Sequence, residues 1–443
     1  MTAHGIDEAT LRRRLDALEP PRGVLEIANR LLDAGHETWC VGGAIRDALL
    51  GRPSLDWDLA TSATPAEMRK VFRRVVPKGE QFGTLGLFDQ DGVMHEVTTF
   101  RRDVQTDGRH AVVEFGASLY DDLARRDFTI NAIAFSPRGR TLHDPFDGVG
   151  DLRRGVVRAV GDADARLRED RLRALRAIRF AARFEFDFDP PTWAAVVASG
   201  PHLGRLSAER VREELDKTLR QVRAPSWALE RWRESGALAT LIPALADVSP
   251  VAFTTLDHLP VPRGRRERGR YLHRLAAPWL ERDRVTAERS LRALRCSNQE
   301  VRWVADLVDR WQRVAGSIRG ALLADAAPAE AELRRWASAV GRVMVADVLR
   351  LGAARWAAER AAGREAPDAA RVRALHRRMI RVAYGQPIEL ADLAVDGGDL
   401  LAAGIAAGPG VGIILQRLLA AVVEDPAEND RERLLARAAA SND

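Results

Sequence analysis

The chain has 443 residues, of which 46% are hydrophobic and 30% charged, a composition typical of ordinary globular proteins. No window reaches the roughly 18 consecutive apolar residues of a membrane span, and Arg12–Arg14 lead into Asp16 instead of an apolar core. These features argue against an integral membrane protein and a secretory signal. The two cysteines, Cys40 and Cys296, are too few for a disulfide framework or a zinc cluster, so we expect a cytoplasmic protein.

The net charge of +5 is compatible with a nucleic-acid partner. All but three of the 68 basic residues are arginine, the exceptions being Lys70, Lys78 and Lys217. GC-rich coding explains such a skew as well as selection does. Charge alone therefore does not identify the partner.

Most of the short strand-like runs lie before residue 145 or so, at 37–41, 57–60, 84–88, 93–99 and 111–115. Helical patterns lie between them, at 46–50 and after Thr64. There, Thr64, Pro65 and Glu67 form the pattern of a capping box. This alternation predicts a mixed α/β head.

After Gly161 the strand signals nearly vanish and helical periodicity dominates. The pattern predicts helices at 164–183, 193–199, 208–221, 226–235, over much of 284–314, over most of 327–381, and at 412–423. Loops are expected at 260–268 and 316–328. The fold class is therefore α+β: a mixed-sheet head at 1–150, a helical neck at 151–222, a helical body at 223–345 and a helical tail at 346–443.

The strongest motif is Gly42-Gly43-Ala44-Ile45-Arg46-Asp47, which is followed by Asp56-Trp57-Asp58. Glycines between a strand and a helix let backbone N–H groups approach a phosphate closely. The two-residue period of a strand places Asp56 and Asp58 on the same face. Carboxylates this close repel each other unless a hard cation lies between them, and oxygen ligands suit Mg²⁺. The alternative is a turn followed by a solvated acidic strand end.

Glu96 begins a second alternating run, 96–100, which we expect to pair beside the strand of Asp56 and Asp58. A third carboxylate there would complete a two-metal site, in which the ions activate an attacking hydroxyl and stabilise the leaving oxygen. The alternative is an ordinary edge-strand glutamate.

Taken together, these motifs resemble the nucleotidyltransferase superfamily. Three further segments, LARRDFTINA at 123–132, DPFDG at 144–148 and REDRLRALRAIRF at 168–180, narrow the resemblance to its class II branch. That branch contains the tRNA CCA-adding enzymes and the bacterial poly(A) polymerases. The matches run in family order from about Trp39 to Glu214. They imply a polymerase-β-like catalytic head, a nucleotide-selecting neck and a tRNA-binding tail.

The resemblance implies that Asp56 and Asp58 are the metal ligands. With Glu96, which the strand pattern suggests, they form the predicted set of catalytic carboxylates. Together with the glycine turn, the resemblance predicts a nucleotide-binding set made of Gly42, Gly43, Arg46, Arg126, Asp127, Asn131, Glu169, Asp170, Arg173, Arg176 and Arg179. In this family the segment around Asp170 selects the base through protein side chains, without a nucleic-acid template.

Physical chemistry supports base selection by Asp170 and Arg173. An aspartate accepts from the exocyclic amine of C or A, and an arginine donates to a ring acceptor. Residues three apart are adjacent on a helix surface, so one such pair accepts C and A and rejects U and G. Arg176 and Arg179 drift by about 60° per step of three, so we expect some of these arginines to contact phosphates or tRNA instead. The alternative is a salt-bridged surface helix.

The resemblance predicts template-independent addition of CCA to the 3′ end of tRNA from CTP and ATP, with Mg²⁺ as cofactor and release of pyrophosphate. The alternatives are a split-function enzyme that adds only CC or only A, a poly(A) polymerase, and a non-catalytic nucleotide- or RNA-binding protein. The segment Asp107–His110 resembles the loop that switches CCA-adding enzymes from C to A. Many bacterial relatives have arginine and proline in place of His110 and Ala111.

The second half of the chain separates family members further. Many relatives carry a phosphohydrolase module with an adjacent His-Asp pair. The corresponding stretch, 257–295, has no such pair, because His258 and His273 are isolated. We therefore predict no phosphohydrolase activity. The runs 395–400 and 408–412 resemble the tail of CCA-adding enzymes, and arginines in 263–270 and 364–381 are expected either to bind tRNA phosphates or to form solvated faces.

Overall fold

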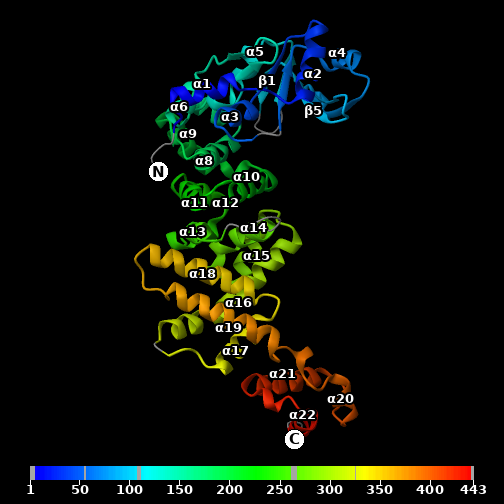
Figure 1. The fold of residues 1–443 in the computed structure, drawn as a ribbon, viewed down its shortest axis with the longest axis vertical. Helices are drawn as coiled ribbons and strands as arrows, with labels where there is room; N and C mark the ends of the chain where they lie inside the picture. The colour runs from blue at the N-terminus through cyan, green and yellow to red at the C-terminus, as the bar shows by residue number, and fades with distance from the viewer. Residues whose placement is uncertain (1–4, 54–55, 107–110, 261–266, 325, 441–443) are drawn as a thin grey trace. The chain divides into compact units, whose positions relative to one another are not determined.

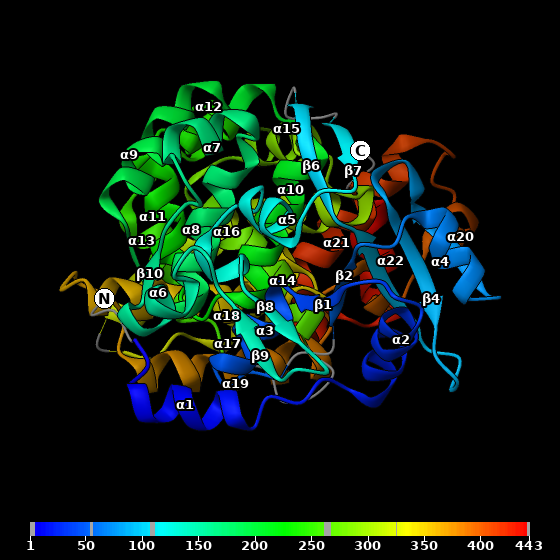
Figure 2. The same cartoon turned by 90° about the horizontal axis from the view of Figure 1, so that it is seen from above.

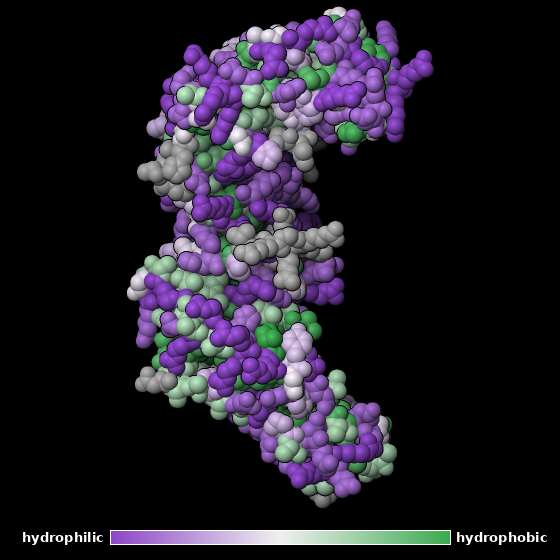
Figure 3. All heavy atoms as spheres, in the orientation of Figure 1, coloured by the Kyte–Doolittle hydropathy of each residue, from purple (hydrophilic) through white to green (hydrophobic). Residues whose placement is uncertain are grey.

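The structure is a computed structural model that describes residues 5–53, 56–106, 111–260, 267–324 and 326–440. The chain forms two compact units, residues 1–223 with 231–241, and residues 224–230 with 242–443 (Figure 1). The finer division into four domains stays a prediction. No helix in the described ranges is long and apolar enough to span a bilayer. Hydrophilic residues predominate on the face of each unit seen in Figure 3.

The first unit contains a seven-stranded mixed sheet (Figures 1 and 2). Its strands, in spatial order, are β3 (Val75–Gly79), β4 (Thr84–Phe88), β5 (Met94–Thr99), β2 (Asp58–Thr61), β1 (Thr38–Val41), β8 (Ala134–Ser136) and β9 (Thr141–His143). Strands β2 and β5 are parallel, and the other neighbours are antiparallel. The predicted mixed sheet is confirmed, including the pairing of the Glu96 strand with the Asp58 strand.

The sequence analysis missed several short strands. Apart from β3, β8 and β9, these are β6 (Arg101–Thr106), which pairs with the predicted β7 (Ala111–Phe115), and the two-residue strands β10 (Val156–Val157) and β11 (Asp187–Phe188). Of these, β8, β9, β10 and β11 have only two or three residues, too few to show the alternation on which strand prediction rests.

Helices connect and flank the strands. They are α1 (Glu8–Asp16), α2 (Arg22–Asp33), α3 (Gly43–Leu49), α4 (Pro65–Val71), α5 (Leu119–Ala124) and α6 (Gly148–Arg154). Of these, α2 and α3 pack directly against the sheet. Fully buried Ile27 and Leu31 of α2 pack toward β1, β2 and β5. The capping box predicted at Thr64 is confirmed, because its side chain accepts from the Glu67 backbone and Glu67 accepts from the Thr64 backbone.

Four helices follow the sheet: α7 (Ala163–Glu169), α8 (Leu172–Phe184), α9 (Pro190–Ser199) and α10 (Ala208–Gln221). The predicted continuous helix over 164–183 is wrong, because the chain breaks between α7 and α8. Asp170 is extended there (φ −147°, ψ 104°), and its carboxylate accepts from the backbone N–H of Leu172 at 3.1 Å. An aspartate that bonds to the nearby backbone in this way competes with helix continuation.

The rest of the described chain is helical. It comprises α11 (Pro225–Glu234), α12 (Ala237–Leu241), α13 (Pro250–Asp257), α14 (Glu267–Ala276), α15 (Arg284–Ala293), α16 (Asn298–Leu323), α17 (Glu330–Val340), α18 (Val345–Ala361), α19 (Ala369–Gly385), α20 (Gly397–Ala402), α21 (Pro409–Glu424) and α22 (Arg431–Ala439).

Two helix boundaries of the second unit differ from the sequence prediction. The helical pattern over 284–314 is interrupted before Ser297, which begins α16 with a capping box that includes Glu300. The prediction of a loop at 316–328 is wrong for residues 316–323, because Gly316 and Gly320 lie inside α16. Each glycine disfavours a helix interior by about 1 kcal/mol, and burial of Ile318 and Leu322 on the same helix offsets that cost.

Candidate active site

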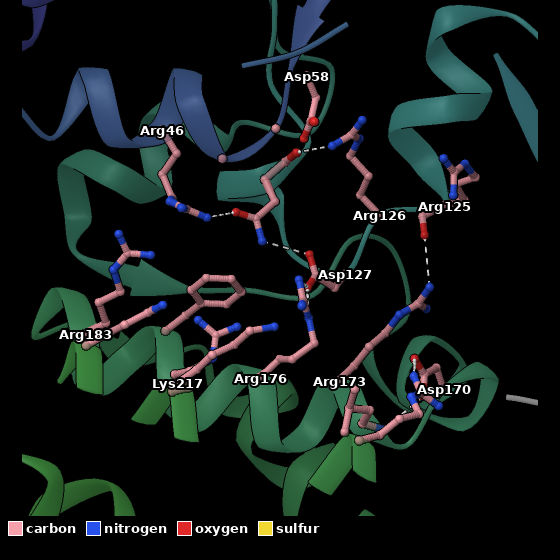
Figure 4. Close-up of a pocket in the computed structure, with 18 residues that line it drawn as sticks. Arg46, Asp58, Arg125, Arg126, Asp127, Asp170, Arg173, Arg176, Arg183 and Lys217 are labelled. Carbon is pink, nitrogen blue, oxygen red and sulfur yellow. Dashed lines mark hydrogen bonds and ion pairs between the residues drawn. The ribbon is translucent and has the colours of Figure 1, made fainter. Parts of the chain in front are cut away.

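A cavity of about 520 Å³ lies within the first unit (Figure 4). Its walls come from the start of α3, the start of β2, the segment after α5, the α7–α8 junction, α8 and α10. Nine of its eighteen lining residues are arginine or lysine, and three are aspartate. A concave site with this excess of positive charge suits a polyanion such as a nucleoside triphosphate.

The cavity brings together most of the predicted site residues. Those that line it are Gly42, Gly43, Arg46, Asp58, Arg126, Asp127, Asn131, Asp170, Arg173, Arg176 and Arg179. Asp56, Glu96 and Glu169 are not among the lining residues. The lining residues that sequence analysis missed are Arg125, Leu172, Phe180, Arg183, Arg210, Lys217 and Gln221. A usable signal existed for Arg210 and Lys217, since a spacing of seven places both on one face of the predicted helix over 208–221.

The glycine turn between β1 and α3 requires a glycine at position 42. Gly42 has φ +79°, a conformation that L side chains rarely adopt. A Cβ atom there would also lie 2.7 Å from Nη1 of Arg126. The turn therefore brings the backbone of the first motif directly against the arginine of the LARRDFTINA segment.

Arg46 is buried and held on two sides. Its Nε and Nη2 donate to Oδ1 of Asp47 at 2.8 and 2.7 Å, and its Nη1 donates to Asn131. The second oxygen of Asp47 accepts from Arg183 at 2.9 Å. Burial lowers the pKa of Arg46, and the adjacent Asp47 charge opposes that effect. Asp47 thus fixes two arginines of the cavity, a function that the sequence analysis did not assign to it.

The predicted carboxylates surround the start of β2. Asp56 is exposed just before the strand, Trp57 is buried, and Asp58 begins the strand. Burial, together with the charges of Asp56 and Glu96, raises the pKa of Asp58 to about 6, and Arg126 opposes this shift. Asp56, Asp58 and Glu96 are therefore electrostatic neighbours, as the paired strands β2 and β5 require.

The donor set fits a hard divalent cation. Asp56 and Asp58 offer only carboxylate oxygens, and their mutual repulsion is the condition that a bound cation relieves. Within the described residues, no three His, Cys, Asp or Glu side chains converge as a metal cluster, and the role of Glu96 as a third carboxylate stays a prediction. Proteins commonly hold Mg²⁺ through one or two carboxylates together with substrate phosphates, which this pair allows.

Asp127 links the two sides of the cavity. Burial alone would raise its pKa, but ion pairing with Arg176 at 2.7 Å and a hydrogen bond from Asn131 at 2.8 Å hold the pKa at about 2. Because Asn131 in turn accepts from Arg46, a continuous chain of contacts runs from Arg176 to Arg46 (Figure 4). This network keeps Asp127 ionised and fixes the orientation of Asn131.

The predicted base-selecting pair is placed differently from the expectation. Asp170 and Arg173 do not lie on one helix surface, because Asp170 occupies the α7–α8 junction. Both still line the cavity. Asp170 accepts from Arg210 at 2.7 Å, and Arg173 donates to Glu169 at 2.6 Å. Glu169, outside the lining, therefore acts on the cavity through Arg173.

Arg176 and Arg179 both face the cavity. Arg179 is almost fully buried and donates to Glu214 of α10 at 2.6 Å. This contact holds Arg179 against α10, and the structure offers no separate outward face for it. Arg176 and Arg179 therefore both line the cavity, although a spacing of three turns their directions on α8 apart by about 60°.

Three predictions concern residues outside the cavity: the loop at 107–110, the arginine-rich run 263–270, and the stretch that lacks a His-Asp pair. The segment Asp107–His110 lies outside the described residues, as do residues 263–266 of the arginine-rich run 263–270. His273 of α14 contacts the Gly269 carbonyl oxygen at 2.6 Å and Asp347 at 3.1 Å. It belongs to no cluster of metal-ligating side chains in the described part of the chain.

The chain is similar to known proteins over most of its length. Family models match at residues 38–158 (Poly A polymerase head domain), 185–248 (Probable RNA and SrmB- binding site of polymerase A) and 357–438 (tRNA nucleotidyltransferase domain 2 putative). The chain is 34% identical to the CCA-adding enzyme of Limosilactobacillus fermentum, over 94% of this chain and 95% of that protein. It is 35% identical to that of Geobacillus thermodenitrificans, over 95% and 97%.

Solved structures give the same result. The crystal structure of the Bacillus stearothermophilus CCA-adding enzyme in complex with CTP matches with a TM-score of 0.71 and 31% identity, covering 96% of this chain and 98% of that one. The Thermotoga maritima CCA-adding enzyme complexed with tRNA shares the fold, with a TM-score of 0.62 at 21% identity and coverage of 98% of each chain. The chain therefore belongs to the CCA-adding enzymes, a class II family of nucleotidyltransferases.

Proposed function

We propose that this chain adds C, C and A to the 3′ end of tRNA, using CTP and ATP and releasing pyrophosphate. The observation that supports this most strongly is one cavity that combines an arginine-rich wall, a glycine turn and Asp58. A cavity for nucleotide binding alone has no need of a raised-pKa carboxylate beside a second one.

Within the cavity the roles follow from position. The backbone N–H of Gly43 and the guanidinium groups of Arg46 and Arg126 bind the triphosphate. Its negative charges attract the positive guanidinium groups. Asp170 and Arg173 contact the edge of the base. Their present partners, Arg210 and Glu169, keep both groups oriented until a nucleotide replaces some of these contacts.

We assign Asp56 and Asp58 as the ligands of a divalent cation, and we propose Mg²⁺. When bound, the cation lowers the pKa of the tRNA 3′-hydroxyl and neutralises charge on the phosphates. The carboxylates position it, and the surrounding arginines position the nucleotide. The protein supplies orientation and charge stabilisation, with no covalent step of its own.

The reaction balances as a single displacement. The 3′ oxygen of the tRNA forms a bond to the α-phosphorus of the nucleotide, and the bond from that phosphorus to the oxygen bridging toward the β-phosphate breaks. The hydroxyl proton passes to solvent, and pyrophosphate leaves. Because tRNA, CTP and ATP are the substrates, we propose that the protein works in the cytoplasm.

Two alanine variants test the carboxylate assignment. Asp56→Ala and Asp58→Ala should each lower incorporation of labelled CMP into tRNA lacking CCA by about 10³-fold or more, because several kcal/mol of charge stabilisation is lost. Asp187→Ala, which changes an exposed aspartate of β11 outside the cavity, is the matched control and should retain full activity. Incorporation at the wild-type rate by either site variant would overturn the assignment.

A further inference from the structure

The ring of Phe180 has three arginines of the cavity wall over it. The guanidinium carbon Cζ lies 4.3 Å from the ring centroid in Arg179, 4.9 Å in Arg46 and 5.3 Å in Arg176. Within about 6 Å, the face of an aromatic ring attracts a cation electrostatically. Phe180 lies on α8 with Arg176 and Arg179, whereas Arg46 belongs to α3. One ring therefore contacts guanidinium groups from two separate helices of the cavity wall.

So many cations over one ring are unusual in this chain. Among the described residues, four other aromatic side chains have a single arginine over each, namely Phe72, Phe82, Phe88 and Trp193. Only Phe184, the neighbour of Phe180 on α8, also has several. Significant contacts of this kind occur about once per 70–80 residues in proteins, so three on one ring are best explained by a specific role.

Neighbouring rings fix the orientation of Phe180. The ring of Phe184 lies parallel to it, with centroids 5.9 Å apart and an interplanar angle of 5°. Phe128 meets it edge to face, at 5.8 Å and 81°. Only 4% of Phe180 is exposed, so the ring cannot turn away into solvent. The three arginines therefore contact a surface whose position is set by the core of the first unit.

The ring attracts the arginines in a way that carboxylates cannot. Each of the three already has a carboxylate partner, in the ion pairs Arg46–Asp47 and Arg176–Asp127 at 2.7 Å and Arg179–Glu214 at 2.6 Å. Further carboxylates would bring the local charge toward zero and weaken the attraction for an anion. An aromatic face attracts the guanidinium groups without adding negative charge. It also leaves the N–H donors that the carboxylates do not occupy available to phosphate oxygens.

We propose that Phe180 is a positioning residue that holds these three guanidinium groups in place for the phosphates of the incoming nucleotide. The guanidinium groups repel one another, since the charge of Arg176 adds to burial in lowering the pKa of Arg179. Without the ring, we expect the arginines to spread apart, and each would then have to be ordered when a nucleotide binds, at a cost in entropy. This inference rests on the proposed function and deepens it, because it names the residue that arranges the arginines before the nucleotide arrives.

Fluorinated rings separate the electrostatic role of Phe180 from its role in packing. Fluorine withdraws negative charge from the ring face and changes the size of the ring little, so mono-, di- and trifluorophenylalanine at position 180 should weaken the attraction in steps. Phe180→Leu removes the aromatic face altogether. The matched control places the same fluorinated residues at Phe135 of β8, a buried ring with no arginine over it in the described part of the chain.

Two measurements are made on each protein. Affinity for CTP and for ATP is measured by calorimetry with Mg²⁺ and without tRNA. Separately, KM and kcat are measured for CMP incorporation into tRNA lacking CCA.

The dissociation constant for CTP should rise with each added fluorine. It should reach about five to ten times the wild-type value for trifluorophenylalanine and for Phe180→Leu. ATP should lose affinity by the same factor, because both nucleotides present the same triphosphate. The KM for CTP should rise in parallel while kcat stays within about twofold of the wild type, as expected when binding is lost equally from the ground state and the transition state. The control series at position 135 should bind CTP as the wild type does.

Equal CTP affinity across the fluorine series would overturn the proposal even if Phe180→Leu binds weakly, because the ring would then act through packing alone. A loss of the same size at position 135, or a loss for only one of the two nucleotides, would also overturn it. CTP affinity that follows the fluorine series, in a protein whose wild-type form adds no nucleotide to tRNA, would instead refute the proposed function and support the role of Phe180.

Discussion

Replacing Asp58, the proposed metal ligand, by asparagine should stabilise the metal-free protein while abolishing its activity. The fold raises the pKa of Asp58 from an ordinary value of 3.8 to about 6, first through burial and then through the charges of Asp56 and Glu96. The folded state therefore disfavours the ionised carboxylate. That destabilisation is absent well below pH 3.8, grows as the pH rises from about 3.8 to about 6 and is complete above that.

A difference of about 2 pKa units corresponds to a loss of at most about 3 kcal/mol in the free energy of unfolding. Because Asp58 is partly exposed, we expect a loss of about 1–3 kcal/mol. For a unit of this size, the melting temperature of Asp58→Asn should rise by about 2–10 °C at pH 7.5 in EDTA. At pH 4.5 the difference should shrink to about a third of its size at pH 7.5, because Asp58 is then protonated in the folded state while the unfolded-state carboxyl is still mostly ionised. Saturating Mg²⁺ should stabilise the wild type and leave the variant unchanged, because a ligand stabilises only the state that binds it.

Thermal unfolding at both pH values, with Asp187→Asn as the exposed control, measures these differences. Glu96→Gln should show a smaller increase of the same sign, because it removes one of the charges that raise the pKa of Asp58. An Asp58→Asn variant that is no more stable than the wild type at pH 7.5 would refute the electrostatic reasoning. A gain of equal size at pH 4.5 would refute it too, because protonated Asp58 carries no charge.

Three other substitutions test the cavity wall. Gly42→Ala should melt at a lower temperature than Gly35→Ala and bind CTP more weakly, because both glycines have positive φ but only the first Cβ meets Arg126. Asp47→Asn should raise the KM for CTP by about tenfold with an unchanged circular dichroism spectrum, since two cavity arginines lose a charged partner. Asp170→Asn should incorporate UMP about 10–100-fold better relative to CMP in single-turnover assays, because an amide can donate to the uracil carbonyl; unchanged discrimination would remove Asp170 from base selection.

Patterns local in the sequence predicted the fold and the site most accurately. The alternating run at Glu96 and the short run at Asp58 indicated two neighbouring strands, and the structure pairs them in parallel. The capping pattern at Thr64 fixed the start of a helix because all its hydrogen bonds lie within four residues. The motifs predicted most of the residues that line the cavity, because the glycine turn and the arginine-rich neck each have a recognisable local sequence.

Contacts between distant segments could not be predicted in this way. The bond from Arg183 to Asp47 joins residues 136 apart, and no spacing along the chain reveals it. Helical periodicity also ran across the α7–α8 junction, where the side chain of Asp170 ends the pattern by bonding to the backbone. Inside α16, Gly316 and Gly320 indicated a loop, but tertiary packing outweighed their low helix propensity.

The most direct test of the proposed function uses one tRNA in three forms, lacking CCA, ending in C and ending in CC. Each form is incubated with Mg²⁺ and with CTP, ATP or both, and products are resolved at single-nucleotide length. The account predicts growth by three, two and one nucleotides with both substrates, followed by arrest. Arrest after CC, growth only from the CC form, a long tail of A, or no growth at all would contradict complete CCA addition.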